Sequence, residues 1–236
     1  MSTDEFSAGA DQWQALLDLD PTQAIAAACR GSGDPATLAW IAEALELDAT
    51  STIVDIGSGL GGAAAWLATR YQCRVVATDP VFEATRCARH VFGLPAAVAS
   101  GSHLPLADHS MDAAIALGVL SVVDDPTALL HEARRVAPRL AVLAYLSTST
   151  SAVRCGGSTF RSQEELLSVL DGAGWTVLAG PTPTTIAAPP SWDIGEANAE
   201  DDPDESAVAG ALDAGRIEPC TVVAAGSDPH HRRAPR

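Results

Sequence analysis

The sequence predicts an α/β fold in which helices cover both faces of a parallel sheet. Three observations carry this prediction. From Thr52 onward, short apolar segments alternate with helical patterns, which is the order of strand–helix–strand units. The apolar segments are continuous runs rather than alternating ones, as expected for strands buried on both faces. A cluster of glycines at 57–62 follows the first strand and leads directly into a helix-forming run.

Length and composition favour one large domain, or a domain with an appendage, in a chain of 236 residues. Apolar residues make up 47%, enough for a single core. No apolar run approaches the roughly 20 residues of a membrane span, and the first six residues lack the features of a signal peptide. The five cysteines are scattered, with no Cys-x-x-Cys pair. We therefore expect small buried cysteines in a reducing cytoplasm.

The charge of the chain excludes one class of partner. The formal net charge is −16, and every basic residue apart from histidine is an arginine. A protein that binds nucleic acid gains affinity by neutralising phosphates, whereas an acidic surface repels them. We therefore expect neither DNA nor RNA as a partner.

The first fifty residues are predicted to be helical. A helical pattern over 11–19 is interrupted by Pro21. A second helix starts at Asp34 and Pro35, because an N-cap acid followed by proline in the first turn is a typical helix start.

The remaining elements follow the alternation of strands and helices. Ser162 and Glu165 form a capping-box pattern ahead of the last core helix. Helices are expected at 61–70, 81–92, 126–136 and 163–172. Strands are expected at 52–56, 74–78, 96–99, 111–116, 139–146, 175–178 and 220–224.

The segment between the last two strands does not fit the alternation. Residues 181–190 hold four prolines, which predicts no regular structure there. An acidic stretch follows at 196–205, and then a possible short helix at 206–214. Loops of this length are usually functional or disordered.

The glycine cluster predicts a ligand site. The run Asp55-Ile56-Gly57-Ser58-Gly59-Leu60-Gly61-Gly62 joins a strand to a helix. Glycine lets the backbone turn tightly and approach a ligand, and the N–H groups at the helix start attract anionic groups. The spacing fits both the dinucleotide fingerprint and the glycine turn of S-adenosylmethionine (SAM) methyltransferases. Asp79, at the end of the second strand, suits ribose hydroxyls in either family.

The choice comes from five further segments, which together resemble class I SAM-dependent methyltransferases of the small-molecule, ubiquinone/menaquinone branch (methyltransferase type 11). Residues 102–115 resemble the family's LPFPDxSFDxV stretch, and 117–126 resemble its xxVLHHVxDP continuation. Residues 129–136 match LxExxRVLKPGG, and 159–175 resemble FtxeElxxlleeAGF. Residues 30–33 resemble an N-terminal Gly-Ser-Gly segment.

The resemblance, which spans roughly residues 30–180, implies a fold and a reaction. The fold is a Rossmann-like three-layer sandwich with a mostly parallel seven-stranded sheet and an antiparallel last strand. The cofactor is SAM, no metal is implied, and methyl transfer proceeds by in-line displacement with mainly positioning catalysis. The cofactor-binding residues implied are Asp55, Gly57, Ser58, Gly59, Gly61, Asp79, Pro80, Ser100, Gly101, Ser102, His103, Leu117 and Gly118.

Each part of this set has an expected role. The glycine turn lines the methionine and ribose of SAM, and Asp79 binds the ribose hydroxyls. Pro80 or the residue after it packs against adenine, and 100–103 form a rim around it. Leu117 and Gly118 face the sulfonium.

Several alternatives stay open at this point. Asp55 either organises the SAM site or only caps the turn, and His103 is either a rim contact or a plain loop residue. Ser100 stands where the family usually has an acid for the adenine amino group. Ser121 stands where many relatives have a large polar residue, so no catalytic base is identified. Arg139 and its neighbour replace the usual glycine pair.

The acceptor is expected to be a small apolar or aromatic molecule. The N-terminal helices and the 181–219 segment, which border the carboxyl end of the sheet in this family, carry tryptophan and small apolar residues. The substrate-side candidates are Ser121, Tyr145 and Trp192.

The expected organisation has five parts: a helical cap at 1–50, the SAM-binding core at 51–180, a lid or disordered insertion at 181–219, the last strand at 220–226 and a flexible tail at 227–236. The oligomeric state stays open, with a homodimer as one alternative.

Two other functions compete with methyl transfer. An NAD-dependent oxidoreductase would need a catalytic pair such as Tyr and Lys, but the chain has no lysine. A catalytically idle SAM-binding module would be expected to lose the glycine turn or Asp79, and both are present.

Overall fold

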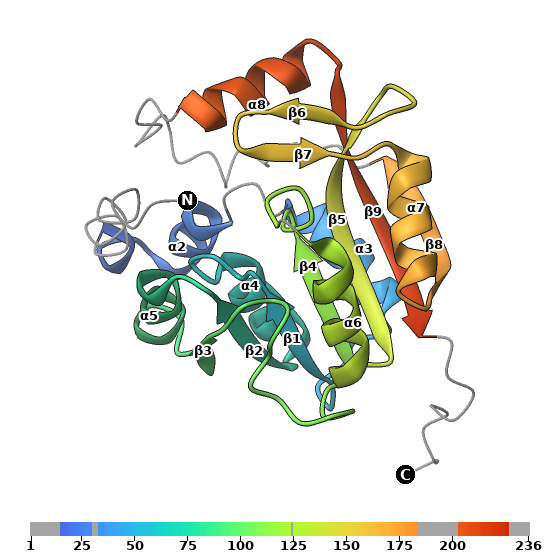
Figure 1. Cartoon of the computed structure of the whole chain (residues 1–236). Coiled ribbons are helices and arrows are strands. Elements are labelled where there is room, and N and C mark those ends of the chain that lie inside the picture. The colour runs from blue at the N-terminus through green and yellow to red at the C-terminus, as the bar shows by residue number, and fades with distance from the viewer. Residues whose placement is uncertain (1–14, 30–32, 124, 184–202, 227–236) are drawn as a thin grey trace.

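A seven-stranded sheet forms the centre of the protein in the computed structural model (Figure 1), which describes residues 15–29, 33–123, 125–183 and 203–226. The strand order is β3-β2-β1-β4-β5-β9-β8. The strands are β1 (Thr52–Ile56), β2 (Arg74–Asp79), β3 (Ala96–Val98), β4 (Ala113–Leu117), β5 (Arg139–Ser147), β8 (Trp175–Pro183) and β9 (Ile217–Gly226).

The sheet is parallel except at one strand. The pairs that β1 makes with β2 and β4 are parallel, as are the β2–β3 and β4–β5 pairs. The last strand, β9, lies between β5 and β8 and runs antiparallel to both. The predicted mostly parallel sheet with an antiparallel last strand is confirmed.

Helices cover both faces of the sheet, which makes three layers. The helices α3 (Pro35–Ala44), α4 (Gly62–Tyr71) and α5 (Phe82–His90) pack on one face, with strand residues such as Ile53 and Ile115. The helices α6 (Pro126–Val136) and α7 (Gln163–Gly172) pack on the other, with residues such as Val54 and Ala114. Neighbouring residues of each strand thus enter opposite cores, which explains the continuous apolar runs.

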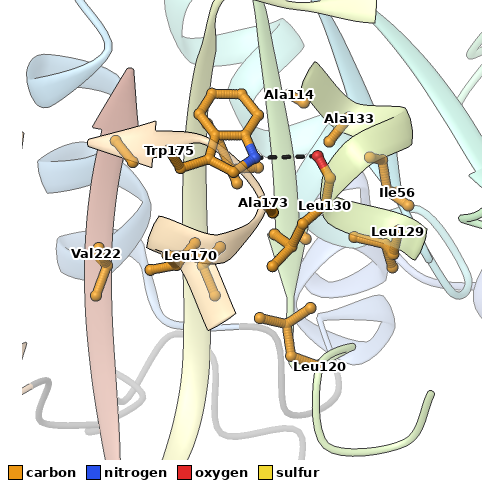
Figure 2. Packing of buried hydrophobic residues seen from close by; sticks show 14 of the residues in the cluster. Ile56, Ala114, Leu120, Leu129, Leu130, Ala133, Leu170, Ala173, Trp175 and Val222 are labelled. Carbon is orange, nitrogen blue, oxygen red and sulfur yellow. Dashed lines mark hydrogen bonds between the residues drawn. The ribbon is translucent and has the colours of Figure 1, made fainter. Parts of the chain in front are cut away.

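Trp175 fills the core beneath α6 and α7 (Figure 2). Its side chain is 1% exposed, and its indole Nε1 donates a hydrogen bond to the carbonyl oxygen of Leu130 at 3.0 Å. This bond satisfies the one polar group of the ring, so the indole is buried without an unpaired donor.

Polar caps fix the helix starts. Asp34 Oδ1 accepts from the backbone amides of Ala36 and Thr37, which confirms the predicted helix start. Ser162 and Glu165 form the predicted capping box. The expectation at Pro21 was incomplete: Asp20 caps a further helix, α2 (Pro21–Ala28), which begins at this proline. Of the helix expected over 11–19, residues 11–14 lie outside the described residues, and 15–17 are helical.

A smaller unit lies above the carboxyl ends of β4 and β5 (Figure 1). It consists of a hairpin, β6 (Val153–Cys155) and β7 (Ser158–Phe160), and the helix α8 (Pro203–Asp213). The buried side chains of Phe160, Ala211 and Ile217 form its core. The hairpin was not predicted, whereas the short helix was. We call this unit, comprising residues 153–160 and 203–213, the cap.

The two last strands extend farther than predicted. β8 continues through Pro181 to Pro183, and β9 already begins at Ile217. The expectation that no regular structure includes these prolines was therefore wrong for 181–183. β8 pairs only with β9, so its outer edge needs no backbone donors and tolerates proline.

Two further expectations concern membrane spans and the cysteines. Within the described residues, no helix is both long and apolar enough to cross a membrane. None of the five cysteines forms a disulfide, and all but Cys155 are buried.

Candidate cofactor site

The glycine turn after β1 is tied to the neighbouring strand β2. The backbone amides of Gly57 and Ser58 both donate to the carbonyl oxygen of Thr78, at 2.7 and 2.9 Å. The Thr78 hydroxyl donates in turn to the carbonyl oxygen of Asp55 at 3.0 Å. These three bonds hold the turn at the carboxyl edge of the sheet, where open α/β sheets bind their ligands.

The glycines at this turn have different roles. Gly57 has a φ of +71°, and a Cβ there would lie 2.5 Å from Val119 Cγ2, so no side chain fits. Gly59 has a φ of +52°, but a Cβ there would meet no atom within 4 Å. Gly57 is therefore required by packing, whereas Gly59 faces an open space that a ligand can enter.

Asp79 connects the end of β2 to the glycine turn. Its carboxylate accepts from the backbone amides of Gly59 and Val81, both at 2.9 Å. Burial raises the pKa of Asp79, although the two amide bonds oppose this shift. Each carboxylate oxygen accepts only one of these bonds and keeps a lone pair for a further donor.

Asp55 carries the clearest sign of a missing partner. The residue is 2% exposed, and its Oδ2 has no hydrogen-bond partner within the described part of the chain; the buried Ser58 Oγ has none either. Burial, and secondarily the nearby charge of Asp79, raises the pKa of Asp55 to about 7. A buried carboxylate without a partner is costly, which indicates a site for a cationic or hydrogen-bond-donating group.

The N-terminal helices border this site. Gly62, the first residue of α4, lies so close to α2 that a Cβ there would be 2.5 Å from the backbone nitrogen of Cys29. Burial, and secondarily the charge of Asp55, raises the pKa of the Cys29 thiol. The end of α2 therefore lies beside the buried carboxylate.

The predicted adenine rim is a hydrogen-bonded turn. Ser102 Oγ lies 2.9 Å from Ser100 Oγ and 3.0 Å from His103 Nδ1, and the His103 amide donates to the Ser100 carbonyl. Ser100 and His103 are exposed, whereas Ser102 is half-buried. The Ala99 amide donates to the Asp79 carbonyl at 3.0 Å, which joins this turn to the end of β2. Pro80, next to Asp79, is exposed.

The residues at and after the end of β4 differ in the atoms that they can present to a ligand. The Leu117 side chain is buried in the core beneath α3 and α4, so only its backbone is available to a ligand. Gly118 has a φ of +76°, and its amide donates to the Leu143 carbonyl. Val119 follows and packs against Gly57.

The substrate-side candidates lie near the cap. Ser121 Oγ donates to the Gly118 carbonyl at 3.3 Å, and the Ser121 carbonyl accepts from the Thr159 amide of the hairpin. The Tyr145 ring packs edge-on against Phe160, with the ring centroids 6.4 Å apart. Burial raises the pKa of Tyr145. Trp192 lies outside the described residues.

The sequence interpretation missed three contributors to the site: Val119 against Gly57, the cap hairpin, and two residues of α6 that hold the rim turn. Of these, only the α6 residues had a signal, because Glu132 and Arg135 are the acid and arginine of the matched LxExxR pattern. No group of three or more His, Cys, Asp or Glu side chains suited to a metal lies within the described ranges.

The fold and the site define a class of domain. A glycine turn between two adjacent parallel strands, with a buried carboxylate on each strand, characterises α/β domains that bind nucleoside-containing ligands. The family model described as a methyltransferase domain matches residues 54–143, which extend from β1 into β5. These residues are therefore similar in sequence to a methyltransferase domain.

Solved structures share the fold at low sequence identity. Geranyl diphosphate C-methyltransferase from Streptomyces coelicolor A3(2), in complex with Mg²⁺, geranyl diphosphate and S-adenosyl-L-homocysteine, is 16% identical with a TM-score of 0.61, over 81% of this chain and 78% of that one. The cyclase SpnF is 19% identical with a TM-score of 0.67, over 81% and 80%. YcgJ from Bacillus subtilis is 14% identical with a TM-score of 0.60, over 82% and 99%. No curated protein sequence matches this chain.

Proposed function

We propose that the chain transfers the methyl group of SAM to a small apolar or aromatic acceptor, held above the carboxyl ends of β4 and β5. The observation that carries this proposal is the buried Oδ2 of Asp55, which has no hydrogen-bond partner within the described part of the chain, in the same glycine turn as the open space at Gly59 and within the matched methyltransferase domain. SAM has an ammonium group and a sulfonium, so it offers cationic groups that can pair with the Asp55 carboxylate.

The site residues support one orientation of SAM. The open face of Gly59 takes the methionine and ribose, and the free lone pairs of Asp79 accept the ribose hydroxyls. The turn 100–103 and Pro80 lie beyond Asp79, so they face the adenine. Gly118, directly after the adjacent strand β4, then faces the sulfonium end. The narrower resemblance to the ubiquinone and menaquinone branch stays a prediction.

Catalysis in this proposal is mainly positioning. SAM supplies a methyl group that is already activated by its positive sulfur. The protein holds donor and acceptor in line and keeps water away from them, which is enough for a large acceleration. Neither Tyr145 nor Ser121 is a ready base, because burial raises the pKa of Tyr145 and the Ser121 hydroxyl donates to the Gly118 carbonyl. This favours an acceptor that is already nucleophilic near neutral pH.

The cap supports a closed acceptor pocket. α8 packs on the hairpin through the cluster around Phe160, and Tyr145 joins this cluster from the end of β5. The hairpin in turn bonds to the loop after β4, because the Thr159 amide donates to Ser121 and the Arg161 guanidinium donates to the Leu120 carbonyl at 2.8 Å. Because 181–183 and 217–219 belong to β8 and β9, we propose that the rest of the predicted 181–219 segment, residues 184–216 with α8, is a lid over the acceptor rather than an insertion without a role.

The charge of the chain favours a neutral or cationic acceptor over a polyanion. A net charge of −16 raises the cost of bringing an anion to the site. The geranyl diphosphate of the similar structures is therefore a useful contrast substrate rather than the expected one.

One experiment tests the acceptor proposal. The protein is incubated with methyl-labelled SAM and a panel of phenols, quinols and apolar enols, with geranyl diphosphate plus Mg²⁺ as the anionic arm. We expect label in a neutral aromatic or apolar product. Transfer to geranyl diphosphate alone would contradict the proposed acceptor class. Binding of SAM without transfer to any compound would favour a protein that binds SAM but does not transfer its methyl group.

The lid is tested by shortening it. Replacement of 184–202 by a short Gly-Ser linker keeps β8, α8 and β9 intact. We expect nearly unchanged affinity for S-adenosylhomocysteine and a large loss of acceptor binding, with Trp192 of the full chain protected from a fluorescence quencher when acceptor is added. Methyl transfer by the shortened protein at the full-length rate would contradict the lid.

A further inference from the structure

The turn 100–103 is followed by a loop that lies along α6 (Figure 1). This loop, residues 104–111, connects the rim to the start of β4. The His109 amide donates to the Arg135 carbonyl, and the Met111 amide donates to the Val136 carbonyl. The loop has no regular structure of its own, so its path depends on what α6 provides.

Two side chains of α6 hold the beginning of this loop. Glu132 Oε1 accepts from the Leu104 amide at 2.7 Å. The Arg135 guanidinium donates to the carbonyl oxygens of Leu104 and Leu106, at 3.2 and 2.8 Å. Leu104 follows directly after the rim and is therefore fixed through both its amide and its carbonyl.

Glu132 and Arg135 also fix each other. Arg135 Nε lies 2.8 Å from Glu132 Oε2, and Nη2 lies 2.7 Å from Glu132 Oε1, which makes a bidentate pair. The Arg135 guanidinium also contacts Asp108 Oδ1 at 2.6 Å. The Glu132 side chain is 14% exposed, whereas that of Asp108 is 69% exposed. Bidentate, partly buried pairs fix geometry better than exposed ones.

A third residue of the same helix face supports the rim itself. A Cβ on Gly101 would lie 2.7 Å from Leu129 Cδ1, so the rim backbone packs directly on this leucine. Leu129, Glu132 and Arg135 are spaced three residues apart and therefore share one face of α6. The helix thus contacts the rim turn at Gly101 and at the residue after His103.

We propose that Glu132 and Arg135 are a positioning pair, which sets the rim turn 100–103 so that it recognises the adenine of SAM. This inference rests on the proposed function, because it takes the turn as the adenine rim. The pair does not touch the ligand. It acts through Leu104, whose fixed backbone determines where Ser102 and His103 lie. The titratable side chains that face this pair are Asp108 and, from the rim itself, His103.

The structure offers a matched control for this proposal. Arg139 Nη1 donates to the Leu45 carbonyl at 2.7 Å and pairs with Glu46 Oε2 at 2.9 Å. Its side chain is 29% exposed, against 32% for Arg135. Both arginines thus bind carboxylate and backbone carbonyl oxygens, although Arg139 has one partner of each kind and Arg135 has two. Only Arg135 contacts the loop that continues the rim. Arg139→Met also removes a carboxylate and a carbonyl contact of a half-buried arginine, so it should cost stability without the effect of Arg135→Met on adenine recognition.

The test compares two ligands that differ only at the base. Dissociation constants are measured by calorimetry for S-adenosylhomocysteine and for S-inosylhomocysteine, in which oxygen replaces the adenine amino group. We expect the wild-type protein to prefer the adenine ligand. We expect Glu132→Gln and Arg135→Met to reduce the ratio of the two dissociation constants by a factor on the order of 2–10, the value of a hydrogen bond. We expect Arg139→Met and Asp108→Asn to keep the wild-type ratio.

Each outcome decides a separate question. If the wild-type protein binds neither ligand, the proposed function fails. If it binds both ligands equally, or if Glu132→Gln and Arg135→Met retain the wild-type preference, the positioning role is overturned while the proposed function stands. If Arg139→Met loses the preference as well, the effect is one of general stability and the positioning role is again overturned. Should one of the two α6 variants fail to fold, the other decides.

Discussion

The backbone amide of Gly59 donates a hydrogen bond to Asp79 Oδ2 at 2.9 Å, although 20 residues separate them in the chain. The carboxylate at the end of β2 thus shapes the turn at the end of β1. Asp79 therefore has two roles: it holds the glycine turn in place, and it accepts hydrogen bonds from the ribose hydroxyls of SAM. A substitution there affects both.

Replacement of Asp79 tests its role in ligand binding. Asp79→Ala should weaken binding of S-adenosylhomocysteine by about 1.5–3 kcal/mol, the value of hydrogen bonds to a charged group. Asp79→Asn, which keeps an acceptor for one of the two amides, should lose less. Calorimetry gives the affinities, and circular dichroism checks that both variants are folded. An unchanged dissociation constant for Asp79→Ala would mean that the ribose lies elsewhere.

A pair of glycine substitutions separates backbone strain from ligand exclusion. Gly59 and Gly93 both have positive φ, +52° and +66°, and a Cβ on either meets no atom within 4 Å. Alanine at either position should cost about 1–2 kcal/mol of folding stability because of the left-handed backbone. Only Gly59→Ala should also weaken SAM binding, and Gly59→Val should abolish it. Equal affinities for Gly59→Ala and Gly93→Ala would show that the open space at Gly59 is not the ligand's.

Gly57 should behave differently from Gly59. Gly57→Ala places a methyl group against Val119, so we expect a loss of folding stability of about 1–3 kcal/mol from overpacking, in addition to the strain. Val119→Ala should recover part of that loss in the double variant, because it removes the methyl groups that clash. Urea unfolding of the four proteins in this cycle measures the coupling. Strictly additive effects would contradict the contact.

The raised pKa of Asp55 predicts how stability depends on pH. In the folded protein this carboxyl ionises near pH 7, whereas in the unfolded chain it ionises near its ordinary value of 3.8. Between these values the folded state binds more protons, so the ligand-free protein should lose stability as the pH rises through this window. Asp55→Asn should remove that part of the loss and so be more stable than the wild type above pH 7.

The pH prediction is measured by urea unfolding at pH 5 and pH 8 without ligand. Asp79 also has a raised pKa and contributes in the same direction, so Asp55→Asn should reduce the pH dependence rather than remove it. Parallel stability curves for the wild type and Asp55→Asn would show that Asp55 is charged and satisfied in the free protein.

Local sequence signals predicted much of the fold. The strands near 52–56 and 139–146 follow from apolar runs, and the helix starts at Asp34 and Ser162 follow from capping residues whose partners lie within the next three positions. These features depend on neighbours in the sequence, so the sequence shows them directly.

The features that were missed depend on distant contacts. The hairpin ending at Phe160 is short and rich in small polar residues, and its one buried aromatic side chain finds its partners in Tyr145, Ala211 and Ile217. β8 includes Pro183 because it is an edge strand, which only the sheet order reveals.

The site shows the same limit. The glycine spacing predicted a turn. Only the structure shows that Val119 fills the space beside Gly57 and that the space beside Gly59 is open. Asp55 could have been a simple cap from its position alone. Its orphaned Oδ2 favours a ligand site, because a cap would have its donors nearby.

The central claim is that this glycine turn binds SAM rather than a dinucleotide. Calorimetric titration of the full-length protein with SAM, S-adenosylhomocysteine, NAD⁺ and NADH tests it most directly. The account predicts that SAM and S-adenosylhomocysteine bind at one shared site with a stoichiometry of about one per chain, and that neither nicotinamide cofactor competes with them. Binding of NAD⁺ or NADH with no response to SAM would contradict the account.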